Sequence, residues 1–183
     1  MSDGHRMEGH LNLLLVTTGG TIEKTYDATA GRLQNVQEVI DQMLEQLSIP
    51  SMDVSRIRLM NKDSLHMTQE DHEAIVSTVM DRHRDHDAIV IVHGTDRLAQ
   101  TGELIHQAFE PDGPSCPVIL TGAMRPWELR RSDAMQNLTE SLIGSRLLSP
   151  GVWAVLHNKA LRFPGVTKDA SEGTFTASPV RSK

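Results

Sequence analysis

The chain has almost no cysteine and no long run of apolar residues. Cys116 is the single cysteine in 183 residues, which excludes a disulfide framework and a cysteine-based metal site and fits a reducing compartment. The longest apolar run surrounds Leu13 to Val16 and is far too short to cross a bilayer. Residues 1–10 are polar and contain histidine, unlike a signal peptide, so we expect a loose leader there. These absences predict a cytoplasmic protein with no membrane partner.

Positive charge is also scarce. Lys and Arg number 18 against 24 Asp and Glu, a formal net charge of -6, which argues against a general nucleic-acid-binding protein. Arg125, Arg130 and Arg131 form a small basic cluster, which we interpret as a solvated loop and not as a nucleic-acid patch. With 38% hydrophobic residues, the chain is long enough to bury the core of one globular domain.

Several motifs with a known chemistry are missing. No G-x-G-x-x-G or G-x-x-x-x-G-K-[ST] is present to hold a nucleotide, and no G-x-S-x-G is present to hold a serine nucleophile. His72 and Glu73 begin like a zinc-protease motif, but Val76 stands where the second histidine is required. We therefore expect no metal site and interpret the nine histidines as surface or packing residues.

What the chain does have is a regular alternation of apolar runs and helical patterns. Continuous apolar runs predict buried strands at about 11–17, 55–60, 88–93, 117–121 and 152–157. Helical spacing predicts helices over 36–48, about 97–109 and 132–148, and a capping box at Thr68 to Asp71 opens another. This repetition predicts a single α/β domain, a three-layer α/β/α sandwich around a mainly parallel sheet.

Two polar segments do not fit this alternation. Residues 23–35 lack a period and directly follow a glycine turn, so we expect either a mobile loop over a site or an ordinary surface loop. Residues 170–183 are rich in Ser and Thr, and we expect a flexible tail.

Small residues, hydroxyls and charges stand where the first four strands end. Thr21 follows Gly19 and Gly20, and the ends of the next three strands are 61–64, 93–96 and 121–126. In an open parallel sheet, ligands bind at the carboxyl ends of the strands. Four such ends together predict a ligand site at this edge of the sheet.

Threonine chemistry remains after these exclusions. A threonine hydroxyl is a poor nucleophile at neutral pH and needs a base or a hydrogen-bond relay to take its proton. The candidate parts are Thr21 as the nucleophile, with Thr95, the adjacent Asp96 and Lys168 as the relay. Lysine can hold a proton in such a relay while a carboxylate keeps its ammonium in place.

Three motifs of the chain resemble the bacterial-type L-asparaginases, the asparaginase/glutaminase family of amidohydrolases. These are Thr-Gly-Gly-Thr-Ile at 18–22, His-Gly-Thr-Asp at 93–96 and Gly-Ala-Met-Arg-Pro at 122–126. The resemblance runs from about 11 to 169, and its order and spacing agree with the family. It implies an enzyme that converts L-asparagine and water to L-aspartate and ammonia through an acyl-enzyme, without a cofactor.

The resemblance also implies individual roles. Thr21 matches the nucleophile, Tyr26 matches a tyrosine that hydrogen-bonds it, and Thr95, Asp96 and Lys168 match the proton relay. Four positions match substrate contacts: Ser64 for the α-carboxylate, Asp96 for the α-ammonium, the Ala123 carbonyl near the amide, and the backbone N–H groups of Gly20 and Thr95. Backbone donors of this kind stabilise the oxyanion of an acyl-transfer reaction.

Two departures from the family pattern affect these expectations. Typical members have a second, smaller domain that helps to build a tetramer, whereas this sequence stops soon after Lys168, so we expect a homo-oligomer, a dimer or tetramer. Leu65 stands where a polar residue is common in some branches, which leaves the choice between asparagine and glutamine open. Two alternatives also stay open: a non-catalytic amino-acid-binding module, and an amidotransferase component that supplies ammonia to a partner.

Overall fold

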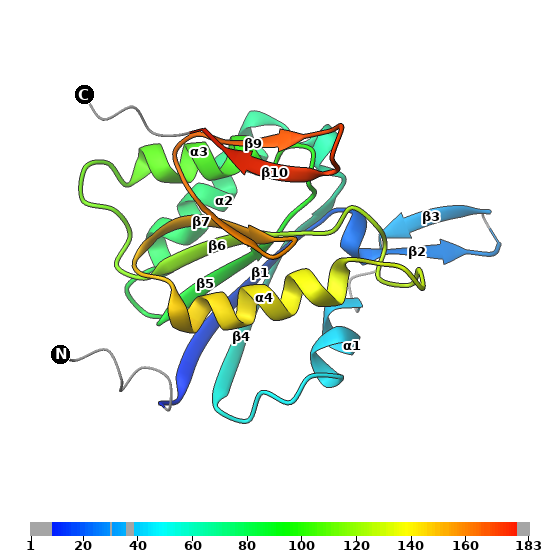
Figure 1. Ribbon diagram of the computed structural model, residues 1–183, viewed down its shortest axis with the longest axis horizontal. Helices are drawn as coiled ribbons and strands as arrows, with labels where there is room; N and C mark the ends of the chain where they lie inside the picture. The colour runs from blue at the N-terminus through cyan, green and yellow to red at the C-terminus, as the bar shows by residue number, and fades with distance from the viewer. Residues whose placement is uncertain (1–8, 30, 36–38, 179–183) are drawn as a thin grey trace.

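A six-stranded sheet forms the centre of the protein in a computed structural model that describes residues 9–29, 31–35 and 39–178 (Figure 1). The strand order is β4-β1-β5-β6-β7-β8. The bounds are β1 Leu11–Gly19, β4 Met52–Lys62, β5 Ala88–Val92, β6 Pro117–Thr121, β7 Gly151–Leu156 and β8 Lys159–Arg162. The first five strands pair in parallel, and β8 is antiparallel to β7 at the edge.

Helices cover both faces of this sheet. Helices α2 (Gln69–Arg82) and α3 (Leu98–Ala108) lie on one face, and α1 (Val39–Glu45) and α4 (Ala134–Leu147) lie on the other (Figure 1). Successive residues of β5 alternate between the two cores: Ile89 and Ile91 join the core under α2 and α3, whereas Val90 and Val92 join the core under α1 and α4. The three-layer arrangement predicted from the sequence is confirmed.

Most predicted elements are present within one to three residues of their expected bounds. The capping box is formed, since the Thr68 side chain accepts from the Asp71 N–H and the Asp71 carboxylate accepts from the Thr68 N–H. The strand expected at about 55–60 is longer, Met52–Lys62. In the described residues, no helix is long and apolar enough to span a membrane.

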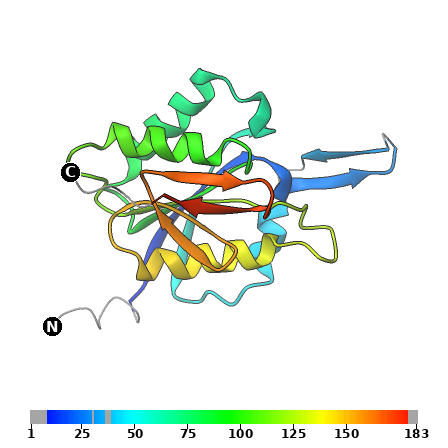
Figure 2. The ribbon, with the colours of Figure 1, turned by 45° about the horizontal axis from the view of Figure 1, so that its top comes forward.

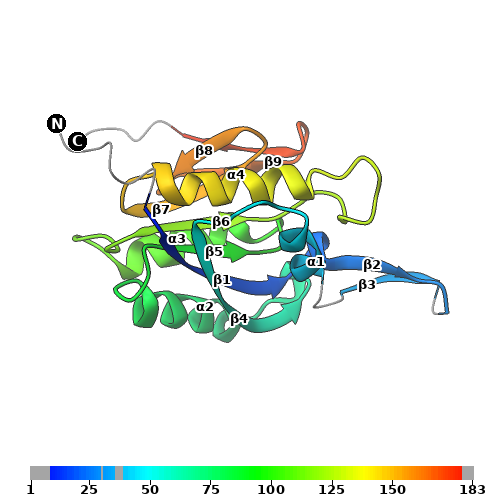
Figure 3. The same cartoon turned by 90° about the horizontal axis from the view of Figure 1, so that it is seen from below.

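Two hairpins replace the segments expected to lack regular structure. Residues 24–35 form β2 (Lys24–Asp27) and β3 (Arg32–Asn35), an antiparallel pair that extends away from the sheet (Figure 3). After β9 (Val166–Asp169), β10 (Thr174–Ala177) pairs back onto it, and this hairpin lies between α3 and α4 (Figure 2). Phe175 is 0% exposed and anchors β10 in the core, so residues 170–178 are not a flexible tail. The leader expected at 1–10 lies outside the described residues except for Gly9 and His10.

Candidate active site

The ends of β1, β4 and β5 are packed against one another through two glycines. A Cβ atom placed on Gly20 would lie 2.6 Å from the Cα of Gly94, and one placed on Gly94 would lie 2.5 Å from the Oγ of Ser64. Gly20 also has a φ of 90°, a conformation that L side chains rarely adopt. Thr21 and Thr95 directly follow these two touching glycines, so the fold brings the first two motifs together.

The three residues expected to form a relay are in contact. Lys168 comes from β9, and its Nζ donates to Thr95 Oγ1 at 3.0 Å and to Asp96 Oδ1 at 2.8 Å. Thr95 is buried, whereas the Asp96 side chain is 41% exposed and the Lys168 side chain 24% exposed. One lysine nitrogen therefore joins a buried hydroxyl to a carboxylate that solvent and ligand can reach.

The nucleophile candidate and its expected tyrosine are not in contact. Thr21 opens a short 3-10 helix, Thr21–Glu23, and no described residue hydrogen-bonds its hydroxyl. Tyr26 lies on β2 with 59% of its surface exposed. Two contacts tie this hairpin to the rest of the site: Lys24 Nζ donates to Asp63 at 2.7 Å, and the Tyr26 N–H donates to Glu128 at 2.7 Å. The Lys24 contact lowers the pKa of Asp63.

The backbone donors differ from expectation. The Gly20 N–H donates to the Lys62 carbonyl at 3.0 Å, so it does not face a ligand. The reason is a register shift between Thr17 and Gly19, which pairs Gly19 with Lys62 and extends the β1–β4 ladder past the end of the regular strand. The N–H groups of Thr21 and Thr95 have no acceptor in the described part of the chain, and they are therefore the donors available to a ligand at these two strand ends.

Ser64 is fully buried, and its hydroxyl lacks a partner. The residue is 0% exposed at the start of a 3-10 helix, Ser64–His66, and its Oγ makes no hydrogen bond to any described residue. A buried hydroxyl without a partner costs about 1–3 kcal/mol. Such a group is typical of a binding position whose partner arrives with the ligand.

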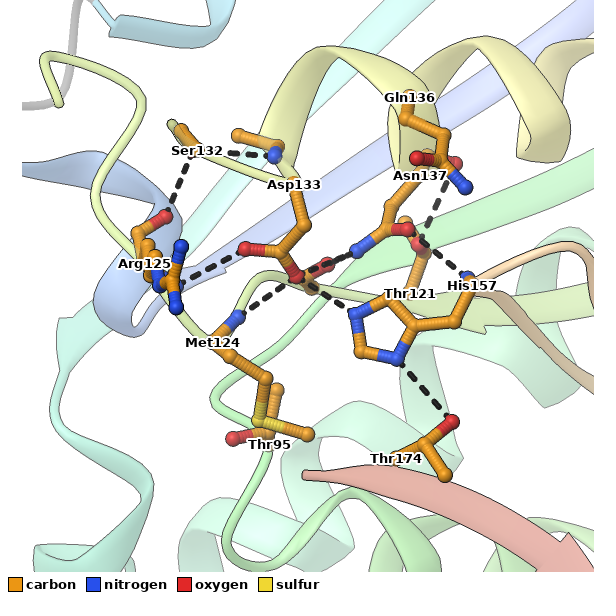
Figure 4. Close-up of polar contacts among 12 residues, drawn as sticks. Thr95, Thr121, Met124, Arg125, Ser132, Asp133, Gln136, Asn137, His157 and Thr174 are labelled. Atoms are coloured by element: carbon orange, nitrogen blue, oxygen red, sulfur yellow. Dashed lines mark hydrogen bonds and ion pairs between the residues drawn. The ribbon is translucent and has the colours of Figure 1, made fainter. Parts of the chain in front are cut away.

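A network of polar contacts that does not stand out in the sequence holds the loop after β6. Figure 4 shows the Asp133 carboxylate accepting from the N–H groups of Met124 and Arg125 at 2.9 and 3.0 Å. The Asn137 amide donates to Asp133 at 2.9 Å and to the Gly122 carbonyl at 2.8 Å. These bonds fix the peptide groups on both sides of Ala123, which is buried. In a trans peptide the C=O and N–H point in opposite directions, so the Ala123 carbonyl points away from Asp133.

His157 completes this network from the end of β7. Its Nε2 lies 2.8 Å from Asp133 Oδ2, and its Nδ1 lies 3.1 Å from the Thr174 hydroxyl of β10 (Figure 4). Burial alone would raise the pKa of Asp133, but the hydrogen bonds from the Met124 N–H and the His157 ring outweigh it and lower that pKa. The signal in the sequence was Asn137, a polar residue one helical turn from Ala134 and Ser141 on the buried face of α4.

Two further buried groups lie at the strand ends. The Glu23 side chain is 1% exposed, and its Oε1 makes no hydrogen bond within the described residues. Burial raises the pKa of this carboxyl to about 7, although the Gly19 N–H and the charge of Arg58 lower it in part. His93 is 0% exposed directly beneath the second motif, and burial lowers its pKa to about 4. Neither residue stood out in the sequence, because glutamates and histidines are common at surfaces.

The comparisons with known proteins agree with this geometry. Residues 12–180 match the family model described as "Asparaginase, N-terminal". The L-asparaginase of Thermococcus kodakarensis is 33% identical over 171 residues, 89% of this chain and 49% of that protein. Its solved structure superimposes with a TM-score of 0.82 at 30% identity, covering 91% of this chain and 51% of the other.

Two other relatives show the range of names among the matches. L-asparaginase 1 of Escherichia coli K12 is 29% identical over 168 residues, 88% of this chain and 48% of that protein. A glutamyl-tRNA(Gln) amidotransferase component of Methanosphaera stadtmanae is 31% identical over 135 residues, 72% of this chain and 30% of that protein. The chain thus spans about half the length of the L-asparaginases that it matches.

Proposed function

Because this chain belongs to the asparaginase family through its N-terminal domain, we propose that it hydrolyses the side-chain amide of L-asparagine to L-aspartate and ammonia. The observation that carries the proposal is the contact of Lys168 with both Thr95 and Asp96, beside the glycine pair that brings Thr21 close. A proton relay next to a threonine whose hydroxyl has no partner among the described residues is the arrangement that nucleophilic attack on an amide requires.

In the proposed reaction, the Thr21 oxygen attacks the amide carbon of the substrate. The hydroxyl proton leaves through Thr95 toward Lys168, and the amide nitrogen takes up a proton as it departs as ammonia. Water then attacks the resulting ester, and the proton it loses restores the Thr21 hydroxyl. The available N–H groups of Thr21 and Thr95 stabilise the oxyanion in both steps.

The other expected roles concern substrate binding. Asp96 is exposed enough to meet the α-ammonium while it holds Lys168. Ser64 offers its unpartnered hydroxyl to the α-carboxylate, and the Ala123 carbonyl accepts from the amide N–H group. Tyr26 acts only if the β2–β3 hairpin moves its ring toward Thr21, because the ring now faces solvent.

Ammonia release tests this proposal directly. We expect the purified chain alone to release ammonia from L-asparagine without an added metal or cofactor. Binding of L-asparagine without ammonia release contradicts hydrolysis and supports an amino-acid-binding module. L-glutamine, assayed in parallel, decides the selectivity that Leu65 leaves open.

A second candidate is an ammonia-supplying component of an amidotransferase. The observation that favours it is the 31% identity to an amidotransferase component over 72% of the chain. Ammonia release that appears only in the presence of a partner protein supports this candidate over free hydrolysis.

We also propose that the chain forms a homo-oligomer in the cytoplasm. The groove between α4 and β8 is lined by apolar side chains, among them Ile143 and Leu147, which are 53% and 57% exposed. A second copy that covers this groove would bury them. Light scattering of the wild type and of Ile143→Glu measures this association, and a wild-type monomer at every concentration contradicts it.

A further inference from the structure

A chain of buried side chains leads from α2 to the second strand-end motif. His72 on α2, Thr101 on α3 and His93 at the end of β5 are 1%, 0% and 0% exposed. Thr101 Oγ1 lies 2.8 Å from His72 Nδ1 and 2.9 Å from His93 Nε2. His93 Nδ1 lies 2.8 Å from the Gly94 carbonyl oxygen. The chain of contacts therefore ends on the peptide group that joins Gly94 to Thr95.

The hydrogen positions follow from what each atom can do. A carbonyl oxygen only accepts, so His93 Nδ1 carries the ring proton and donates to Gly94. Burial keeps His93 neutral, since its pKa is lowered to about 4, and its Nε2 therefore accepts from the Thr101 hydroxyl. Thr101 Oγ1 also lies 3.2 Å from the Arg97 carbonyl, but that oxygen already accepts from the Thr101 N–H.

The remaining ring fits the same assignment. With its own proton given to His93, the Thr101 oxygen accepts from His72, so His72 Nδ1 carries a proton and its Nε2 is bare. His72 Nε2 is buried and has no hydrogen-bond partner among the described residues. Burial and the neighbouring Arg97 lower the pKa of His72, which keeps this ring neutral as well.

The direction of the last hydrogen bond has a consequence for the site. The Gly94–Thr95 peptide is trans, since the cis peptides lie at Glu110-Pro111 and Phe163-Pro164. Its N–H therefore points opposite to its carbonyl, away from the buried His93 ring. Hydrogen bonds in series polarise one another, so donation to the Gly94 carbonyl makes the Thr95 N–H a stronger donor.

We infer that His93, held by Thr101 and His72, is a positioning residue that aims and polarises the Thr95 N–H as an oxyanion donor. This inference rests on the proposed function. It also gives a role to a histidine that the sequence alone assigns to packing. A histidine that only fills space needs no particular tautomer and no particular hydrogen-bond donor.

Two substitutions separate positioning from packing. In His93→Asn the amide nitrogen can take the place of Nδ1 and keep the donor to Gly94, whereas in His93→Gln the amide reaches toward Thr101 and that donor is lost. We expect His93→Gln to lower kcat for L-asparagine by about 10²-fold with KM little changed, as loss of one oxyanion donor does. We expect His93→Asn to retain much more of the activity, although it leaves the larger cavity. Equal losses, or a worse Asn variant, overturn the inference.

Matched variants protect this test against simple loss of stability. His83 is another buried histidine, bonded to Ser115 away from the strand ends, and His83→Gln should leave kcat unchanged. Thr101→Ser keeps the hydroxyl and should keep kcat, whereas Thr101→Val should lower it. If His93→Gln does not fold, the Thr101 pair decides the question.

A spectroscopic measurement keeps this inference separate from the proposed function. Ring ¹⁵N NMR should show His93 protonated on Nδ1 and bare on Nε2, unchanged between about pH 5 and about pH 8, where an ordinary histidine titrates. A proton on Nε2 overturns the inference. A wild-type chain that releases no ammonia overturns the proposed function, whereas an active wild type with equal Asn and Gln variants overturns only the role of His93.

Discussion

The proton-relay half of the site is assembled, whereas the nucleophile half is not. Lys168 already holds Thr95 and Asp96 through hydrogen bonds of 3.0 and 2.8 Å. On the other side, the Thr21 hydroxyl has no partner among the described residues, and Tyr26 faces solvent on a hairpin. The relay residues sit on the sheet and on a hairpin anchored in the core by Phe175, but β2 and β3 pair only with each other in the described structure. The comparison teaches that rigid elements supply the acid–base groups, while the nucleophile's surroundings are completed when the ligand binds.

The largest effect should come from the unassembled half. Thr21→Ala removes the attacking oxygen and should lower kcat for L-asparagine by on the order of 10³ or more without changing the fold. Steady-state kinetics measures the loss, and circular dichroism checks the fold. The matched control is Thr139→Ala, an exposed threonine on α4. Turnover near the parental level in Thr21→Ala would place the nucleophile elsewhere.

In the assembled half, the losses should not add. Lys168→Met and Thr95→Val should each lower kcat by on the order of 10²–10⁴, and the double variant should be little worse than either. The reason is that one missing member already breaks the relay. Asp96→Ala should raise KM as well, through loss of the ammonium contact. Losses that simply add in the double-mutant cycle would assign Lys168 and Thr95 to separate tasks.

Ser64 offers a sharper version of the comparison, because it is rigidly placed but unsatisfied. Ser64→Ala removes a buried hydroxyl without a partner among the described residues, so the free protein should become more stable by about 1 kcal/mol. KM should rise while kcat stays close to the parental value. Urea unfolding and steady-state kinetics measure the two effects. A destabilised variant with unchanged KM would show that the hydroxyl has a structural role only.

The smallest effect on catalysis, but a clear one on stability, should come from Glu23. Its pKa rises from 4.5 to about 7 on folding, so the folded state holds the proton more tightly. Stability is full below pH 4.5 and falls as the pH rises through 7. Glu23→Gln removes this loss, so its advantage over the wild type should grow by up to about 3 kcal/mol from acidic to alkaline pH. Exposed Glu172→Gln is the control, and a pH-independent difference would contradict the burial cost.

The sequence predicted the parts of the site that follow from the parallel sheet. Thr21, Ser64, Thr95 and Ala123 follow strands marked by apolar runs, and such strand ends must meet at one edge. The hairpins β2–β3 and β9–β10 were missed because strands of four residues show too little alternation, and only Phe175 marks β10 as buried. The use of the Gly20 N–H depends on a register shift in the sheet, which no residue pattern reveals. The Asp133 network joins side chains from two elements to backbone groups, a combination visible only in three dimensions.

The central claim is that Thr21 carries an acyl group during hydrolysis. Rapid acid quenching of the Lys168→Met variant during turnover of L-asparagine, followed by intact mass and peptide mapping, examines it directly. We predict an adduct with the mass of an aspartyl group on the peptide that contains Thr21, and none when Thr21→Ala is added to the same variant. An adduct on another residue, or one that persists in the Thr21→Ala background, would contradict the account.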